Sequence, residues 1–388
     1  MSKDLDISIS KGRFRKIREW NRRRNYYLKE VRLNIKVYIA KIIWDKRKKS
    51  VFDINSVKTV LLLRNEGTIG DMVVYSPLVK SLYDAGYEVD ILLTKSSSAV
   101  MKYNPYVRNI YEADDGSAEV YLKRYRHTVP ESAIKAMNKN NYDLVIDPSL
   151  FDTPVHRMRL LREINGKSVL GFNKWRVINH YSKSLHFKSG TEHVTTAVSL
   201  IADCMQLNPI KLRPYKLHLP DSILNEVREY LASLGNQKKV IINIFTGSPE
   251  RCFSQEQLAE IIELLNESYS DVKVILLDHR KEITISLPEN VVINPFGSLH
   301  HVMALIHEVD LIISPDTSIV HISAAWEKPL ISVYKNVVDN NDLWAPGYDN
   351  ASQIIVQHRM MARGENIPEL IMQEIDKRGL LDDKQQAL

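Results

Sequence analysis

Two strand-to-helix turns contain most of the residues that could do chemistry. The first, residues 64–71 (Arg-Asn-Glu-Gly-Thr-Ile-Gly-Asp), follows an apolar run and opens a helical stretch. Gly67 and Gly70 permit a tight turn and a close approach of the backbone to a ligand. The glycine spacing is not that of a dinucleotide-binding fingerprint, and no Gly-Lys-Ser/Thr of a P-loop follows. We therefore interpret this turn as a place where a ligand can approach the backbone, but not as a dinucleotide site or a P-loop.

Asp71, the last residue of this turn, has two interpretations. It can be a helix N-cap, in which the carboxylate satisfies free backbone amides. It can also be a carboxylate at the cleft that acts as a general base. The sequence favours neither interpretation over the other.

The second turn is Ser314-Pro315-Asp316-Thr317-Ser318. A helix that starts here offers free N–H groups and a partial positive charge, which suit a diphosphate. Thr317 and Ser318 add hydroxyl donors, and His321 lies about one turn further in, within reach of the same anion or of a sugar. The alternative is that Asp316 or Thr317 is only a cap and that His321 is a buried, hydrogen-bonded core residue.

The segments around these turns alternate between strand and helix patterns. Apolar, strand-like runs are found at residues 57–63, 89–93, 144–146, 169–172, 240–245, 272–277, 311–314 and 330–333. Helical stretches are found at 72–85, 130–139, 193–205, 255–268, 299–308, 318–326 and 367–378. This alternation predicts an α/β protein with parallel sheets, in which ligands bind beyond the carboxyl ends of the strands.

Length and composition favour two domains. The 388 residues exceed one ordinary core, and a polar, proline-containing stretch at 208–220 is a candidate linker. We expect a basic extension at 1–50, a first domain at 51–210 and a second domain at 211–388, whose last helix can pack back on the first domain. The two cysteines give neither a disulfide framework nor a metal cluster, so we expect a reducing compartment.

The positive charge is concentrated at the N-terminus. Residues 1–50 contain 17 Lys or Arg and 5 Asp or Glu, whereas the rest contain 36 and 42. Residues 11–49 interleave this charge with apolar and aromatic side chains, which favours an amphipathic helix on an anionic membrane surface. A helix packed on the body is the alternative, and both can hold if the Ile and Val side chains pack inward.

A nucleic-acid surface ranks last, because no nucleic-acid-binding module follows Arg22-Arg23-Arg24. We therefore expect no nucleic-acid partner. No run of eighteen apolar residues and no secretory signal are seen, so we expect a cytoplasmic protein that is peripheral at a membrane.

Taken together, the motifs resemble glycosyltransferase family 9, the ADP-heptose:lipopolysaccharide heptosyltransferases, which have the GT-B fold of two Rossmann-like domains facing across a cleft. The resemblance runs from about residue 57 to residue 357. It is carried, in order, by residues 60–64 with Gly70-Asp71, Ser76-Pro77-Leu78, residues 104–107, 143–147 and 310–325, and Lys328-Pro329.

The resemblance implies an inverting transfer of heptose from ADP-heptose to the lipopolysaccharide core. It implies that residues 51–210 form the acceptor domain, with Gly67 and Gly70 at the acceptor cleft, and that residues 211–388 form the nucleotide-sugar donor domain. Asp71 matches the catalytic base of the family, and Arg251 aligns with a basic residue that contacts phosphate. Thr246 is expected at the same diphosphate, and Asp316, Thr317 and Ser318 form the helix-end cradle. No metal or other cofactor is expected, because Arg251 and the helix end can neutralise the leaving group. The alternatives are another donor, such as a UDP-sugar, and a non-catalytic glycan- or lipid-binding scaffold.

Overall fold

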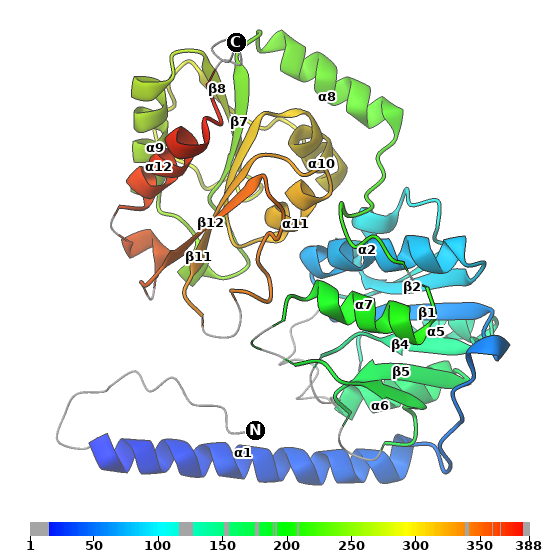
Figure 1. Ribbon diagram of the computed structural model, residues 1–388. Helices are drawn as coiled ribbons and strands as arrows, with labels where there is room; N and C mark the ends of the chain where they lie inside the picture. Colours follow the sequence, from blue (N-terminus) through cyan, green and yellow to red (C-terminus); the bar gives the residue numbers. More distant parts are fainter. Residues whose placement is uncertain are drawn as a thin grey trace.

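A computed structural model describes residues 15–115, 127–150, 155–174, 178–188, 190, 192–207, 209–337, 341–358, 360–364 and 366–382. Residues 11–14 of the expected membrane segment lie outside these ranges. The described chain forms two sheets, each of six parallel strands, which are covered by helices (Figure 1). The predicted two-domain α/β fold is therefore confirmed.

The first sheet has the strand order β3-β2-β1-β4-β5-β6. Its strands are β1 (Thr59–Arg64), β2 (Glu88–Thr94), β3 (Asn109–Ala113), β4 (Leu144–Asp147), β5 (Ser168–Phe172) and β6 (Lys183–Leu185). The second sheet has the order β12-β11-β10-β7-β8-β9. Its strands are β7 (Lys238–Asn243), β8 (Val272–Leu277), β9 (Val291–Ile293), β10 (Leu311–Pro315), β11 (Leu330–Lys335) and β12 (Ala351–Val356).

Both sheets reverse their strand order at one point, between β1 and β4 in the first and between β7 and β10 in the second. Ligands of open parallel sheets bind at such points, beyond the carboxyl ends of the strands. The turn that ends in Asp71 follows β1, and the turn that contains Asp316 follows β10. The sheet order thus places each predicted turn at the switch point of its own sheet.

The helices that cover the sheets are α1 (Arg15–Trp44), α2 (Ile69–Asp84), α3 (Lys95–Ser98), α5 (Glu131–Asn138), α6 (Val155–Ile164), α7 (Thr195–Cys204), α8 (Asp221–Ser233), α9 (Gln255–Ser268), α10 (Leu299–Glu308), α11 (Ser318–Ala324) and α12 (Ile367–Arg378). The segments that become β3, α6, α8 and β12 carry no element in the sequence-based prediction. The apolar side chains of α12 pack in one cluster with those of α9, on the second sheet (Figure 1).

One apolar cluster is continuous across the two units. It joins side chains of α2 and α7 on the first sheet to side chains of α10 and α11 on the second, and a typical pair is Val73 and Val320. Apolar burial is the main favourable term in folding, so this shared cluster holds the two switch points against each other. A second cluster lies on the α9 and α12 side of the second sheet, and a third on the α5 and α6 side of the first.

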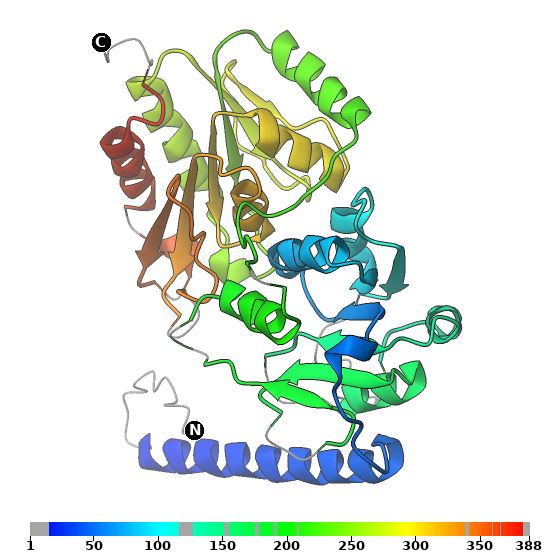
Figure 2. The ribbon, with the colours of Figure 1, turned by 45° about the vertical axis from the view of Figure 1, so that its right-hand side comes forward.

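Helix α1 lies along the first unit and runs beyond it (Figures 1 and 2). Near its C-terminal end, Val37 and Ala40 are buried in the third cluster, with Leu33 and Trp44 packed beside them. Ile35, Ile39 and Ile42 are exposed. The interpretation in which the Ile side chains of this segment pack inward is therefore wrong, because a different face of the helix meets the body.

Candidate active site

The two predicted turns meet where α2 packs against α11. Gly70 makes this contact possible, because a Cβ atom built on it would lie 2.7 Å from Cδ2 of His321 and 3.5 Å from the Cα of Ser318. Any larger side chain would push the two helix starts apart. The residues that sequence analysis assigned to the acceptor and donor sides are thus brought together.

Asp71 lies in the first turn of α2, and its carboxylate is held by three donors. Arg64 Nη2 is 2.7 Å from Oδ1, while the backbone N–H and the hydroxyl of Thr68 donate to Oδ2 at 2.7 and 2.8 Å. Thr68, and not Asp71, is the N-cap of α2, but Asp71 closes a capping box by accepting from the Thr68 backbone N–H. The predicted capping role is therefore confirmed, and only the predicted N-cap position is wrong. Burial raises the pKa of Asp71, but the Arg64 guanidinium and the Thr68 hydrogen bonds outweigh it and leave the pKa below its ordinary value.

Arg64 is a residue of this site that the sequence analysis did not assign. Its guanidinium lies 4.8 Å from the ring centroid of Tyr75, and a Cβ atom on Gly67 would be only 2.8 Å from Nη2. Gly67 therefore leaves the room that the guanidinium needs to reach Asp71. The position of Arg64 at the carboxyl end of β1 is the signal that could have identified it.

Behind the same turn lies a buried network of charges. Glu66 accepts hydrogen bonds from Arg157 at 2.9 Å and pairs with His156 Nε2 at 2.7 Å, and Arg157 also donates to Asn65 Oδ1 at 2.8 Å. Burial raises the pKa of Glu66, but Arg157 and His156 outweigh it and lower the pKa to about 2. Since His156 and Arg157 belong to α6, this helix holds the loop that leads to Asp71. Neither side chain stands in a recognisable motif, so this support could not be predicted from residue patterns.

On the donor side, Arg251 and Asp316 form an ion pair, with Arg251 Nη1 2.7 Å from Asp316 Oδ2. Arg251 ends the short helical turn Pro249–Arg251 after β7, and Asp316 follows β10. Burial raises the pKa of Asp316, and the Arg251 guanidinium offsets part of this rise. The Arg251 side chain remains about one third exposed, so a ligand anion can reach it.

Thr246 shapes the loop that leads to Arg251. Its hydroxyl donates to the carbonyl of Ser248 at 2.6 Å and accepts from the Ser248 N–H at 3.0 Å. Arg280 Nη2 donates to the Thr246 carbonyl, and the Arg280 guanidinium lies 5.1 Å from the Phe245 ring centroid. Arg280 follows β8 and is a second cation at this edge that the sequence analysis did not place in the site.

Thr317 caps α11, because its hydroxyl accepts a hydrogen bond from the N–H of Ile319 at 3.2 Å. Ser318 is the first residue of the helix and is half-buried against Gly70. The turn therefore presents a capped helix end toward α2, and Asp316 stands just before the cap.

His321 is buried between the two units. Its ring lies 5.7 Å from that of Trp344 and 6.5 Å from that of Tyr215, and its Nδ1 has no hydrogen-bond partner within the described structure. Burial lowers the pKa of His321 to about 4, so the ring is neutral at neutral pH. His321 is a buried residue, as the alternative interpretation proposed, but the hydrogen bond expected at its Nδ1 is not made within these residues.

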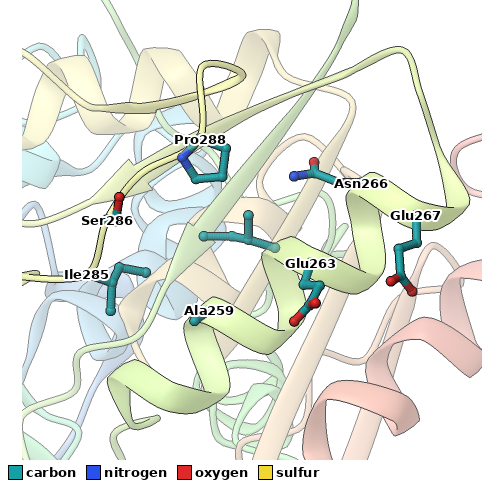
Figure 3. Close-up of a pocket in the computed structure, with 8 residues that line it drawn as sticks. Ala259, Glu263, Asn266, Glu267, Ile285, Ser286 and Pro288 are labelled. Atoms are coloured by element: carbon teal, nitrogen blue, oxygen red, sulfur yellow. The ribbon is translucent and has the colours of Figure 1, made fainter.

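A cavity of about 310 Å³ lies away from these residues, between α9 and the loop before β9 (Figure 3). Figure 3 shows Ile285, Ser286 and Pro288 of that loop facing Ala259 and Asn266 of the helix. No predicted site residue lines it. Within the described ranges, no three His, Cys, Asp or Glu side chains gather in a group that could hold a metal ion.

The fold and the paired turns define a GT-B glycosyltransferase. The sequence model of glycosyltransferase family 9 (heptosyltransferase) matches residues 131–367, which is more than half of the chain. The chain therefore belongs to this family and is a glycosyltransferase.

Known proteins agree with this assignment. The chain is 22% identical over 343 residues to "Putative lipopolysaccharide heptosyltransferase 4" of Escherichia coli (strain K12), covering 87% of this chain and 91% of that protein. Its fold is similar to a family 9 glycosyltransferase of Veillonella parvula (TM-score 0.63, 14% identity, 86% of this chain and 92% of that chain). It is also similar to E. coli ADP-heptose lps heptosyltransferase II (TM-score 0.63, 16% identity, 83% and 98%).

Proposed function

We propose that the protein transfers heptose from ADP-heptose to the core oligosaccharide of lipopolysaccharide, with inversion at the anomeric carbon. The observation that carries this proposal is the contact between the Asp71 turn and the Asp316 turn at the two switch points. A transferase needs a base for the acceptor and a cradle for the donor within reach of one anomeric carbon. Family membership supports the sugar, and the name of the E. coli relative supports the acceptor.

Asp71 is the proposed base. The acceptor hydroxyl gives its proton to the carboxylate, its oxygen forms a bond to the anomeric carbon, and the bond from that carbon to the β-phosphate oxygen breaks, so that the electron pair leaves with ADP. Arg64 and Thr68 keep Asp71 ionised and oriented before the acceptor arrives. The same contacts make the carboxylate a weak base, so the acceptor has to displace or share at least one of them.

The diphosphate site is proposed at Arg251 and the start of α11. When a diphosphate binds, the Arg251 guanidinium would break its ion pair with Asp316 and contact the phosphate instead. A charge-assisted hydrogen bond to phosphate can compensate for the lost contact with the carboxylate. Thr317 and Ser318 lie at the same helix end, and Thr246 holds the loop that carries Arg251. We place His321 at the sugar side, since it fills the space between the two turns. The solved E. coli heptosyltransferase WaaC with ADP supports an adenine nucleotide as donor.

No metal is proposed, because Arg251 and the α11 N–H groups can stabilise the charge that develops on ADP. Adding a chelator should therefore leave the rate unchanged, and a loss that Mg²⁺ restores would contradict this part of the proposal.

We also propose that the enzyme is peripheral at the cytoplasmic face of the inner membrane, with residues 11–49 against anionic lipid. The acceptor class supports this, since a lipopolysaccharide core is attached to a lipid. Within the described part of the chain, no helix has the length and apolar character needed to span a bilayer.

The test is to incubate the protein with a panel of sugar nucleotides and truncated core lipopolysaccharides and to weigh the products. Transfer from ADP-heptose should add one heptose to one acceptor, and NMR of the new linkage should show the inverted configuration. Transfer from a UDP-sugar but not from ADP-heptose would contradict the proposed donor. Retention of configuration at the anomeric carbon would contradict the proposed inverting mechanism. Asp71→Asn is the matched control for background transfer.

A further inference from the structure

Helix α1 exposes a row of large apolar side chains to solvent. Six large side chains are spaced along α1 by three or four residues, or by seven or eight. Such spacings place them on one side of the helix. They are Ile17, Trp20, Tyr27, Ile35, Tyr38 and Ile42, here called the outer stripe, and each is between 54% and 69% exposed. Folded monomers rarely expose so many large apolar side chains in one row, so we expect the outer stripe to contact a partner.

The outer stripe is not the face that attaches α1 to the protein. Leu33, Val37, Ala40 and Trp44 pack on the third apolar cluster, and at 100° per residue they point nearly opposite to the outer stripe. The helix is fixed there by polar contacts as well, because His180 Nε2 lies 2.7 Å from the Trp44 carbonyl and Asp45 accepts from the N–H of Asn179 at 2.8 Å. The C-terminal part of α1 thus has one face packed on the body, whereas the outer stripe is exposed among the residues that the structure describes.

Positive charge borders the outer stripe on both sides. Ten Lys or Arg and two Glu occur in α1. By helical position, Lys16, Arg23 and Lys41 lie along one edge of the stripe and Arg32 lies along the other, while Arg24 lies within the stripe between Trp20 and Tyr27. An apolar face between two basic edges is the pattern of a helix that lies in the headgroup region of an anionic bilayer.

We propose that α1 lies flat on an anionic lipid surface through its outer stripe and that it holds the acceptor domain next to that surface. This inference rests on the membrane part of the proposed function and specifies which face meets lipid. The apolar side chains enter the interface, and the flanking Lys and Arg contact lipid phosphates. A second copy of the chain fits less well, because two such helices would bring two strongly basic surfaces together.

The contacts of α1 determine how the enzyme is oriented. Its occupied face packs on α6, and His156 and Arg157 of α6 hold Glu66 in the turn that leads to Asp71. In both views the second sheet lies on the side of the first unit away from α1 (Figures 1 and 2). A bilayer under the outer stripe therefore meets the acceptor domain first and leaves the donor domain on the solvent side. This arrangement suits an acceptor that is anchored in lipid and a donor that is soluble.

The experiment measures binding of the full chain to vesicles that contain phosphatidylglycerol and to vesicles of phosphatidylcholine alone. The triple variant Ile35→Ser/Tyr38→Ser/Ile42→Ser removes the centre of the outer stripe without touching the packed face. The matched control, Val51→Ser/Tyr83→Ser/Ile355→Ser, removes exposed apolar side chains from the body. We expect the stripe variant to bind the anionic vesicles at least about tenfold more weakly and the control to bind like wild type.

Three outcomes would overturn the proposal. The first is equal binding of the stripe variant and wild type to anionic vesicles. The second is equal binding of wild type to both kinds of vesicle. The third is a wild-type dimer in lipid-free buffer that the stripe variant converts to monomer, which would assign the stripe to a second copy. Activity on a lipid-free, truncated core oligosaccharide should not change in the stripe variant. If wild type is inactive on that acceptor, the proposed function fails independently of the vesicle result.

Discussion

The turn that ends in Asp71 and the turn that contains Asp316 lie close together, yet their carboxylates differ in their contacts and in the direction of their pKa shifts. Asp71 is contacted by one guanidinium and two hydrogen-bond donors, and its pKa lies below the ordinary value. Asp316 pairs with Arg251, and burial raises its pKa. Behind Asp71 lie the buried charges of Glu66 and Arg157, whereas the groups beside Asp316 include the neutral hydroxyls of Ser314 and Thr317.

This difference indicates which half of the site is built before substrate arrives. Arg157 is almost fully buried, so no ligand can replace its contacts with Glu66. Arg251 is partly exposed, and an anion can compete with Asp316 for it. We infer that the loop that leads to Asp71 is in place before substrate arrives and that the ion pair on the donor side is exchanged on binding.

Asp71→Asn should lower kcat by about a thousandfold, within the range for loss of a general base, and should leave the affinity for ADP nearly unchanged. Initial rates with ADP-heptose and calorimetry with ADP measure the two quantities. Asp84→Asn, at the exposed end of the same helix, is the control and should have wild-type rates. Normal turnover by Asp71→Asn would remove Asp71 as the base.

Arg157→Met should reduce the free energy of unfolding by about 3 kcal/mol, because it leaves Glu66 and Asp147 buried without their cation. Urea denaturation measures this change. Arg228→Met breaks the more exposed pair with Glu308 and should cost less than about 1 kcal/mol. Equal losses in the two variants would mean that the network behind Asp71 contributes no more than a surface ion pair.

Arg251→Ala should weaken ADP binding by roughly 10- to 100-fold, which corresponds to the loss of one hydrogen bond to a charged group. Calorimetry gives the dissociation constant. Lys335→Ala is a suitable control, because Lys335 pairs with Glu250 beside the same loop and has no proposed role. ADP affinity that is equal in Arg251→Ala and wild type would place the diphosphate elsewhere.

Arg64→Gln should move the acid limb of the kcat profile to higher pH. The Arg64 guanidinium helps keep the pKa of Asp71 below its ordinary value, so its loss raises that pKa, and the ionised base is then lost at a higher pH as the solution is acidified. Arg64→Lys should move the limb back toward the wild-type position. A limb that stays in place would show that Thr68 alone maintains the ionisation of Asp71.

Much of the fold could be predicted from the sequence, because buried parallel strands read as continuous apolar runs and their helices as periodic ones. The prediction missed β12, whose residues are mostly half-buried, and α6, whose pattern mixes Arg and His with apolar residues. Both turns with candidate site residues could also be recognised, because each is a short local sequence at the end of a strand. Their order along the chain made the family recognisable.

Residue patterns were enough to locate the two turns and the basic amphipathic segment, and the family resemblance added Arg251 to Asp71 and Asp316 as charged candidates. The packing of distant segments was needed to show which cation contacts which carboxylate, that α6 supports the Asp71 turn, and which face of α1 is exposed. These are contacts between segments far apart in the chain. Local residue patterns specify a helix and its apolar positions, but the face that is covered depends on packing against the rest of the fold.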